Sequence, residues 1–297
     1  MESMGSSDSI LAKSLQGWQP RTVTLTRRVD PWPAAAFAHL IGTDTPPLRD
    51  GDPLPPMWHT FTLLEHPATS EIGVDGHPAA GPFLPPVPGR RRMFAGGRLR
   101  MDAPIPIGAE LSSTSAVTSV TVKQGRTGEI AFVTVRHELA ADGSRVGAEE
   151  QDIVYRSEPP GTQPRVMSRP ETGEPELTGD WRLEIEADPV LLFRFSALTY
   201  NGHRIHYDRD YATTAEGYPD LVIHGPLLAL LALELPRLHA PGAAVTAFEY
   251  RLVRPAFVPA RIVSAANAPA PAAGSEIEAA VAAVGADPSL TAKITLA

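Results

Sequence analysis

Residues 193–235 read FRFSALTYNGHRIHYDRDYATTAEGYPDLVIHGPLLALLALEL and contain the two features that decide the fold. The first is a polar, histidine-rich loop, NGHRIHYD, at residues 201–208. The second is an apolar Leu/Ala run that Gly225 and Pro226 open. Gly-Pro is typical of a helix start, because proline costs nothing where the first amides have no partner. The stretch therefore predicts a polar loop followed by a helix.

The expected helix covers residues 225–235, and Pro236 is expected to end it. Its leucines cover all sides and Glu234 is its only charge, so it must be buried. Eleven residues are too few to span a bilayer. A buried helix start, with its free amides and positive dipole, can stabilise a developing oxyanion close to the histidine loop.

The loop and the helix resemble the MaoC-type hydratases and dehydratases. The stretch YNGHRIHYD, Tyr200 to Asp208, resembles one subfamily of them, the mesaconyl-C4-CoA and itaconyl-CoA hydratases and the hydroxyacyl-thioester dehydratases of type 2. PPMWHTF (55–61), GPFLPPVPGRRRMFAGGRLR (81–100), FVTVRHE and EEQDIVYR (within 132–156) extend the resemblance to residues 23–297. It implies an α+β tandem (double) hot-dog fold, in which two antiparallel sheets each wrap a central helix.

The resemblance also implies the catalytic residues. His206 falls on the motif histidine that activates water, and Gly225 falls on the glycine whose amide polarises the thioester carbonyl. The motif aspartate falls on Asn201, which cannot act as a base but can hold water or substrate. Either His206 is the sole base, or a second group completes the pair. The candidates for that group are Asp208, Glu65, Asp75 and His203.

Substrate-binding candidates surround this motif. Arg204 could bind a substrate carboxylate through two hydrogen bonds, or form an ion pair with Asp208 or Asp210. Residues expected to line the substrate pocket are Tyr200 and His203. His224 is expected either to line it or to be a buried structural histidine, and Trp58 and His59 either to line it or to serve only in core packing. A basic segment could bind the phosphates of CoA or phosphopantetheine, or be only a solvated loop; it includes Arg90, Arg91, Arg92, Arg98 and Arg100.

Composition limits the other classes of function. The net charge of −8 argues against nucleic acid as the main partner. The chain has no cysteine, which excludes a thiolate nucleophile or a Cys-bound metal. Nucleotide-binding glycine motifs are not found, and His203-x-x-His206 alone is weak evidence for a metal. We therefore expect no metal and no cofactor, a cytoplasmic protein without a signal peptide, no membrane contact and a homo-oligomer, a dimer of double hot-dogs.

Pattern and composition divide the chain into four parts. Residues 1–20 are expected to be disordered, 21–156 to form the first hot-dog unit, 157–180 to be a linker and 181–297 to form the second unit with the motif. In the first unit we expect a helix at 30–41 after Asp30, a helix at 55–64 and a hairpin at Asp142-Gly143. In the second, 181–186 and 193–196 lead in as strands, and further strands cover about 246–254, 260–267, 275–284 and 290–296.

The two units show a faint internal match, Leu99–Leu111 against Tyr250–Ile262, while the motif loop occurs only in the second. One active site per chain follows, with a first unit that accommodates the acyl group. The expected reaction is hydration or dehydration of a 2,3-unsaturated acyl thioester of CoA or acyl-carrier protein. The resemblance favours mesaconyl-C4-CoA, then itaconyl-CoA. Alternatives are a carrier-protein dehydratase of fatty-acid or polyketide synthesis, a thioesterase and a non-catalytic acyl-thioester-binding module.

Overall fold

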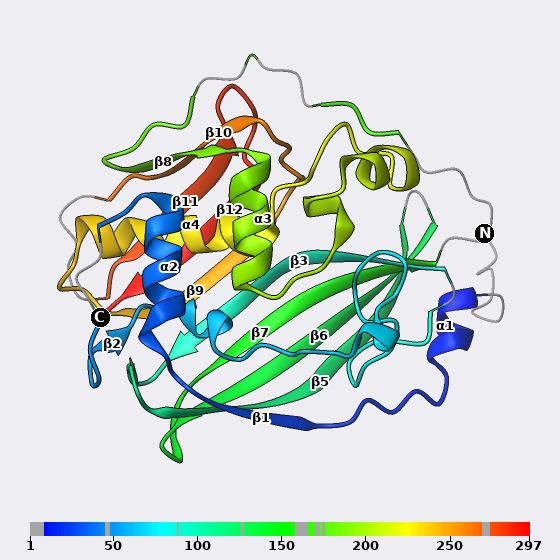
Figure 1. Cartoon of the computed structure of the whole chain (residues 1–297), viewed down its shortest axis with the longest axis horizontal. Helices are drawn as coiled ribbons and strands as arrows, with labels where there is room; N and C mark the ends of the chain where they lie inside the picture. Colours follow the sequence, from blue (N-terminus) through cyan, green and yellow to red (C-terminus); the bar gives the residue numbers. More distant parts are fainter. Residues whose placement is uncertain are drawn as a thin grey trace, which may run out of the picture.

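The computed structural model describes residues 9–44, 48–87, 89–125, 128–157, 166–169, 173, 176–268 and 274–297. One ten-stranded antiparallel sheet runs through the molecule in the order β1-β5-β6-β7-β3-β9-β12-β11-β10-β8 (Figure 1). The first half contributes β1 (Val23–Arg28), β3 (Arg90–Met101), β5 (Glu110–Gly125), β6 (Gly128–Ala141) and β7 (Ser144–Ser157). The second half contributes β8 (Trp181–Ala187), β9 (Val245–Leu252), β10 (Ala260–Ala266), β11 (Glu276–Ala283) and β12 (Leu290–Leu296).

The two halves repeat one plan and meet at their equivalent strands. In each half the first strand lies at the outer edge, and β3 and β9 pair antiparallel in the middle, with Gly97 opposite Tyr250. The two stretches that match in sequence run from these joining strands into β5 and β10. The fold is therefore the double hot-dog with α+β content that the sequence predicted, with its two sheets joined edge to edge. A separate two-stranded sheet pairs β2 (Pro53–Leu54) with β4 (Ile105–Pro106).

Helix α4 (Gly225–His239) is the core helix of the second half, and the sheet curves around it (Figure 1). Its residues 227–236 are buried, and it contacts all five second-half strands. The prediction that Pro236 ends it was wrong, since the helix continues to His239. Proline removes only one backbone hydrogen bond, and packing holds the last turn, where His239 stacks on Trp181 at a centroid distance of 5.8 Å.

Within the described residues, the first half has no matching long helix. The helix expected at 55–64 is a short 3-10 helix, η1 (Trp58–Phe61), followed by a long segment up to β3. Pro67, Gly73, Gly76 and Pro78 lie in that segment, and such residues disfavour a continuing helix. A second short 3-10 helix there is η2 (Thr69–Glu71).

Helices α2 (Pro31–Ile41) and α3 (Pro189–Leu198) follow the first strand of each half and pack against each other. The first was predicted, and Asp30 caps it by accepting a hydrogen bond from Trp32 N at 2.7 Å. The second corrects the expectation of a strand at 193–196. Asp188 caps α3 in the same way and Pro189 occupies its first turn, and these start signals outweigh the short apolar run.

The described N-terminal residues are more ordered than the sequence predicted. Residues 10–15 form α1 (Ile10–Leu15), and Leu11 is fully buried against β6 and β7, so disorder up to residue 20 was wrong there. Residues 1–8 lie outside the described residues. The division into two units remains a prediction; β7 ends at Ser157 and β8 begins at Trp181, but much of the expected linker is outside the described residues.

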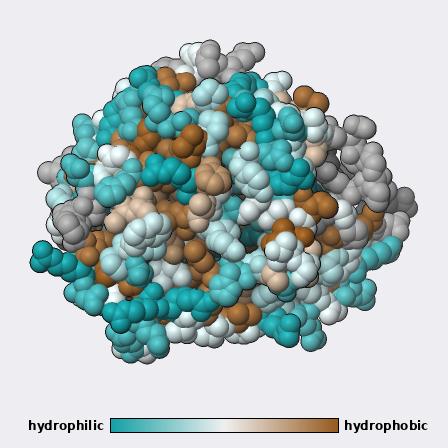
Figure 2. Space-filling model, in the orientation of Figure 1, coloured by the Kyte–Doolittle hydropathy of each residue, from teal (hydrophilic) through white to brown (hydrophobic). Residues whose placement is uncertain are grey.

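Apolar side chains gather on the face that carries α2 and α3 (Figure 2). Trp32, Val190 and Phe193 are 70%, 63% and 62% exposed. Between the two helices lies a shallow hollow of 400 Å³, lined in part by Trp32, Leu40 and Phe193. None of the helices within the described ranges has both the length and the apolar character needed to cross a membrane.

Candidate active site

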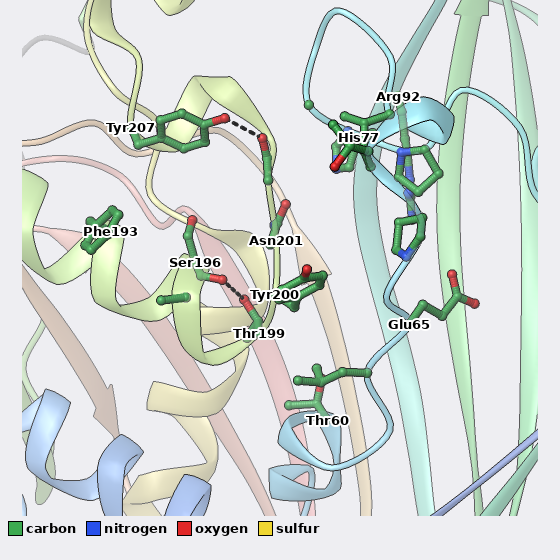
Figure 3. Close-up of a pocket in the computed structure, with 18 of the residues that line it drawn as sticks. Thr60, Glu65, His77, Arg92, Phe193, Ser196, Thr199, Tyr200, Asn201 and Tyr207 are labelled. Atoms are coloured by element: carbon green, nitrogen blue, oxygen red, sulfur yellow. Dashed lines mark hydrogen bonds between the residues drawn. The ribbon is translucent and has the colours of Figure 1, made fainter.

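A cavity of 610 Å³ lies between segments from the two halves (Figure 3). The first half supplies residues of the 60–78 segment and Arg92 from β3. The second half supplies α3 residues and the start of the motif loop, including Tyr200, Asn201 and Tyr207. In Figure 3, Asn201 and Tyr207 stand on one wall and His77, Arg92 and Glu65 on the other. A ligand in this cavity would therefore touch both halves.

His206 is buried at the end of the 3-10 helix η3 (Arg204–His206) and is 7% exposed. Its Nδ1 lies 2.7 Å from the carbonyl oxygen of Val222. A carbonyl only accepts, so Nδ1 carries the proton and donates, and Nε2 of the neutral ring has the lone pair. Burial lowers the pKa of His206 to about 4. Its base form therefore predominates at neutral pH.

His206 belongs to a chain of four histidine rings in which each ring contacts the next. His206 stacks on His224 with a centroid distance of 3.6 Å, His203 meets His206 edge-on at 5.5 Å, and His77 lies 4.0 Å from His203. Burial, helped by the positive charge that His77 and His206 could carry, lowers the pKa of His203 to about 2, and burial also lowers that of His224. Because water has little access to this cluster, the charged forms of its histidines are disfavoured.

Asn201 occupies the cavity wall at the position of the motif aspartate. Its Oδ1 accepts a hydrogen bond from the backbone N–H of His203 at 3.0 Å. The side-chain NH₂ group is then the donor that remains for a ligand. The preceding residue, Tyr200, also lines the cavity and has a positive φ of 51°. That conformation is uncommon for an aromatic residue and is often retained at functional sites.

The helix start that should hold the oxyanion lies next to the histidine cluster. His224, whose Nε2 shares a hydrogen bond of 2.9 Å with Ser196 Oγ, is the residue before α4. Gly225 packs so closely on β9 that a Cβ there would lie 2.4 Å from Leu252 Cδ1. A larger residue here would require Leu252 to move, and the oxyanion role of the Gly225 amide stays a prediction. The described residues that line the cavity include neither Gly225 nor His203, His206 or His224.

The arginines divide into paired and available groups. Arg204 donates to Asp208 Oδ2 at 2.7 Å and stacks over Tyr211 at 4.1 Å, which is the ion-pair alternative of the sequence prediction. Arg91 is bound by Glu216, and Arg98 by Glu150 and Asp152. Phosphate binding by Arg91 or Arg98 would require these pairs to open. Arg92 lines the cavity, and the described residues offer it no ion-pair partner.

Trp58 and His59 lie in the core beneath the cavity rather than in its wall. Both are almost fully buried, at 1% and 3% exposed. His59 Nε2 and Glu149 Oε2 are 2.7 Å apart, and Arg237 lies over the Trp58 ring at 5.5 Å. These contacts support the core-packing alternative for both residues.

His77 is the cavity residue that sequence reasoning missed. It lies two residues after Asp75, which the sequence suggested as one possible source of the missing carboxylate. The only available signal was a short Asp-x-His stretch in a Gly/Pro-rich segment. Such a signal says nothing about which distant loop the segment touches.

The sequence was compared with known families and proteins. The family model for hydroxyacyl-thioester dehydratase type 2 matches residues 57–258. The mesaconyl-C(4)-CoA hydratase of Chloroflexus aurantiacus is 43% identical over 235 residues, which cover 78% of this chain and 82% of that protein. The mitochondrial hydroxyacyl-thioester dehydratase type 2 of Schizosaccharomyces pombe is 47% identical over 72 residues, 24% of each chain.

The fold was compared with solved structures. A MaoC-like dehydratase from Phytophthora capsici superposes with a TM-score of 0.66 over 97% of each chain, at 13% identity. A Mycobacterium tuberculosis protein described as a double hotdog superposes with a TM-score of 0.55, at 15% identity, over 95% of this chain and 96% of that one. At such low identity these similarities support the fold alone.

Proposed function

This chain belongs to the hydroxyacyl-thioester dehydratase type 2 family and is a hydro-lyase, and from that premise we propose that its substrate is a short, anionic 2,3-unsaturated acyl-CoA. The first candidate is the C4-thioester of mesaconate, which the Chloroflexus relative's name specifies. The second is itaconyl-CoA, an isomer whose double bond lies one carbon farther from the thioester. Water adds to the β-carbon and a proton adds to the α-carbon. The same site catalyses the reverse reaction.

In our proposal His206 accepts the proton of the attacking water. The carbonyl of Val222 holds its Nδ1–H, so the Nε2 lone pair is fixed in orientation. Proton transfer by a positioned side chain typically contributes ~10²–10⁴-fold in rate. His206 lies behind the cavity wall, and the water must reach it past Asn201, whose NH₂ group can hold the water oxygen.

Negative charge develops on the thioester oxygen as an enolate. We assign its stabilisation to the amide of Gly225 and to the positive end of α4, which follows directly after His224 in the histidine cluster. Loss of one such donor typically costs ~2.7–4 kcal/mol in the barrier. The long apolar body of α4 is anchored by the sheet, so its start is held rigidly.

We assign the second carboxylate of the substrate to Arg92. The sequence suggested Arg204 for this task, but Arg204 is held by Asp208 and by the carbonyl of Val74. Arg92 instead lines the cavity opposite Asn201 (Figure 3). A guanidinium in this place suits a planar carboxylate, whereas the crotonyl group would leave it without a partner.

The observation that carries this proposal is the position of the motif loop. Asn201 lies in the wall of a cavity between the halves, and the buried His206, five residues later, stacks on His224 at the start of a buried helix. The family's reaction requires a base, a water site and an oxyanion donor close together. The loop and helix bring candidates for all three into one place.

The test follows absorbance of the enoyl-thioester bond with mesaconyl-C4-, itaconyl- and crotonyl-CoA and with a crotonyl-carrier protein. We expect loss of the band with mesaconyl-C4-CoA, a much lower kcat/KM for crotonyl-CoA, and no release of free thiol. Release of CoA thiol would identify a thioesterase, and a preference for the carrier protein would identify a carrier-protein dehydratase. Binding without turnover would identify an acyl-binding module.

We further propose that the enzyme needs no cofactor, acts in the cytoplasm and forms a dimer of double hot-dogs. The exposed apolar face over α2 and α3, with Trp32, Val190 and Phe193, supports self-association through that face. Sedimentation velocity of the wild type and of Trp32→Glu tests it, with a dimer expected for the first and a monomer for the second.

A further inference from the structure

A short segment of the first half docks directly on the motif loop. Residues 72–78 form a hairpin closed by the bridge between Ile72 and Pro78. The backbone N–H of Arg204 donates to the carbonyl oxygen of Asp75 at 2.9 Å. Gly76 has a φ of +87°, and a Cβ there would lie 1.9 Å from the carbonyl oxygen of Gly202. The two backbones can therefore approach this closely only because Gly76 has no side chain.

The docked hairpin carries an Asp–His pair into the cavity. His77 Nδ1 lies 3.5 Å from Asp75 Oδ2, and the backbone N–H of His77 donates to Asp75 Oδ1 at 3.0 Å. Burial alone would raise the pKa of Asp75, but the nearby His77 ring and the hydrogen bond from the His77 backbone N–H together outweigh burial and lower that pKa to about 2. Asp75 is therefore ionised at neutral pH. An ionised carboxylate beside an imidazole orients the ring and stabilises its protonated form.

The pair joins the histidine cluster from the side opposite His224. The ring of His77 lies 4.0 Å from that of His203, and single ligand-type atoms of Asp75, His77 and His203 all lie within 4.8 Å of one another. His77 lines the same cavity as Asn201 (Figure 3) and its side chain is 20% exposed. It can thus reach both a bound ligand and solvent.

We propose that His77, oriented by Asp75, is a second catalytic residue of this site and donates the proton that the α-carbon receives during hydration. This inference rests on the proposed hydratase function. The carboxylate that the family's motif places in the second half, and that Asn201 lacks, is supplied by Asp75 from the first half. The active site is therefore a composite of both halves.

The two histidines divide the proton transfers. His206 Nε2 takes a proton from water as the water oxygen bonds to the β-carbon, and the π electron pair moves into the thioester as an enolate. The enolate then takes a proton from His77 Nε2, which forms the Cα–H bond and leaves His77 neutral. Protonated His206 and neutral His77 return to their starting states by proton exchange with water. Atoms and charge balance, and no co-reactant is required.

The groups around His77 decide its charge. Asp75 is the carboxylate in contact with it, while His203 and His206 are neutral neighbours within the cluster. Arg92 is the cation of the same cavity and Tyr211 the phenol whose ionisation Asp75 opposes. Glu65 is a second carboxylate that lines the cavity, but Asp75 is the one whose oxygen lies 3.5 Å from the His77 ring, so Asp75 contributes most to stabilising protonated His77.

The first experiment compares His77→Gln with His66→Gln, the same substitution in the same segment but at an exposed residue outside the cavity wall. The kcat/KM of the wild type for hydration should fall at high pH, as His77 loses its proton. We expect His77→Gln to lower kcat roughly 10²-fold, with little change in KM, and to remove this basic limb. His66→Gln should keep both the rate and the limb.

The second experiment uses Asp75→Asn, which retains the size of the side chain and removes its charge. We expect the basic limb to move to lower pH by about one unit or more, since an opposite charge at this distance shifts a pKa by about 1–3. A purely structural role of the hairpin would lower the rate without moving the limb. If His77→Gln does not fold, Asp75→Asn alone decides the question.

An active wild type whose His77→Gln variant folds and keeps its rate and basic limb overturns this inference alone. An unmoved limb in Asp75→Asn overturns it as well. A wild type without turnover on the enoyl-thioester panel overturns the proposed function, and the inference with it. Metal analysis of the purified wild type should find no stoichiometric divalent cation. A cation bound at one per chain and required for activity would overturn the proton-donor role.

Discussion

The segments that follow α2 and α3 occupy the same place in the two halves and are of similar length, yet they are used differently. After α3, the chain forms the motif loop and then the fifteen-residue helix α4 inside the sheet. After α2, the described residues form β2, the short 3-10 helices η1 and η2, and otherwise irregular chain up to β3. The second half thus builds the helix that the chemistry needs. The first half uses the corresponding residues to cover the site and form its opposite wall.

The two halves also differ in where they bury polar groups. In the second half the buried histidines cluster at the motif loop, with His206 and His224 stacked beside the start of α4. In the first half the buried pair is His59, in η1, and Glu149, in β7, and neither residue lines the cavity. The first group is expected to act in catalysis and the second in stability. Substitutions in the two halves should separate these roles.

The largest effect is expected for His206→Ala. It removes the proposed base, so kcat should fall ~10²–10⁴-fold, with far-ultraviolet circular dichroism unchanged. Steady-state hydration of mesaconyl-C4-CoA measures it. A variant that folds and retains wild-type turnover would place the base elsewhere in the cavity.

His59→Ala tests the corresponding buried histidine of the first half. Burial raises the pKa of Glu149, but the hydrogen bond and charge of His59, with smaller contributions from His137 and Gln151, together outweigh burial and bring that pKa to about 2, so the carboxylate is ionised. Removing His59 leaves an ionised group buried without its partner, which typically costs about 3–5 kcal/mol in the free energy of unfolding. Denaturant titration should show this loss, while kcat of the folded fraction stays within a few-fold of wild type. His66→Ala, at an exposed position, is the matched control.

Substitutions at Asn201 distinguish its two possible roles. It is either a neutral hydrogen-bond donor or a former base that has lost its carboxylate. Asn201→Asp restores the carboxylate of the family motif, but it places a negative charge opposite an anionic acyl group. Like charges brought together cost several kcal/mol, so kcat/KM for mesaconyl-C4-CoA should fall roughly 10²-fold. Asn201→Ala loses only a hydrogen bond, about 1 kcal/mol. A gain with crotonyl-CoA in Asn201→Asp would instead identify Asn201 as a decayed base.

Arg92→Ala should have an intermediate effect, and it should depend on the substrate. Loss of a charged hydrogen bond costs about 1.5–3 kcal/mol, so KM for mesaconyl-C4-CoA should rise roughly ten- to hundredfold, with KM for crotonyl-CoA unchanged. Arg145→Ala removes an equal charge at an exposed pair with Asp102 and is the control. Equal KM changes for both substrates would mean that Arg92 binds the CoA portion.

Local signals predicted much of the fold. The Asp30 cap and early prolines gave α2, and Asp142-Gly143 gave a hairpin in which both residues have positive φ. The second-half strands at 245–252, 260–266, 276–283 and 290–296 fall within about a residue or two of expectation. The failures arose where two local signals competed, as at 193–196, or where tertiary packing overrode one, as at Pro236 and Leu11.

The part of the site formed by residues close in sequence was predictable. The part formed by contacts between the two halves was not. The loop at 201–208 and the helix start at 225 are close in sequence, so their proximity could be inferred. His77 reaches His203 only because the 72–78 hairpin docks on the motif loop through backbone contacts. Backbone contacts of this kind leave almost no trace in side-chain patterns, apart from the glycine at 76.

The smallest expected effect is a loss of folding stability at mildly acidic pH. The buried histidines of the second half should cause it. The folded pKa of His206 is about 4, below its ordinary value of 6.5. The unfolded chain therefore binds a proton first as pH falls below about 6.5, and this destabilises the folded state progressively down to about pH 4. His203 and His224 act in the same direction. Glu149 contributes little between pH 7 and pH 5, because its pKa is 4.5 unfolded and about 2 folded, so its stabilising effect is lost mainly below pH 5.

His206→Gln removes one of these protonations and keeps the side chain polar. The wild type should lose stability between pH 7 and pH 5, and the variant should lose less, by an amount on the order of 1–2 kcal/mol. Urea titrations of both proteins at the two pH values measure the difference. His239→Gln provides the control, because this histidine lies at the exposed end of α4 and shares its contacts with Arg182 and Trp181 instead of the cluster. Equal losses in wild type and His206→Gln would mean that the buried imidazole is protonated as easily in the folded chain as in the unfolded one. The histidines of the second half would then be more accessible to water than their burial indicates. The two halves would differ in their contribution to catalysis and not in how buried histidines affect the pH dependence of stability.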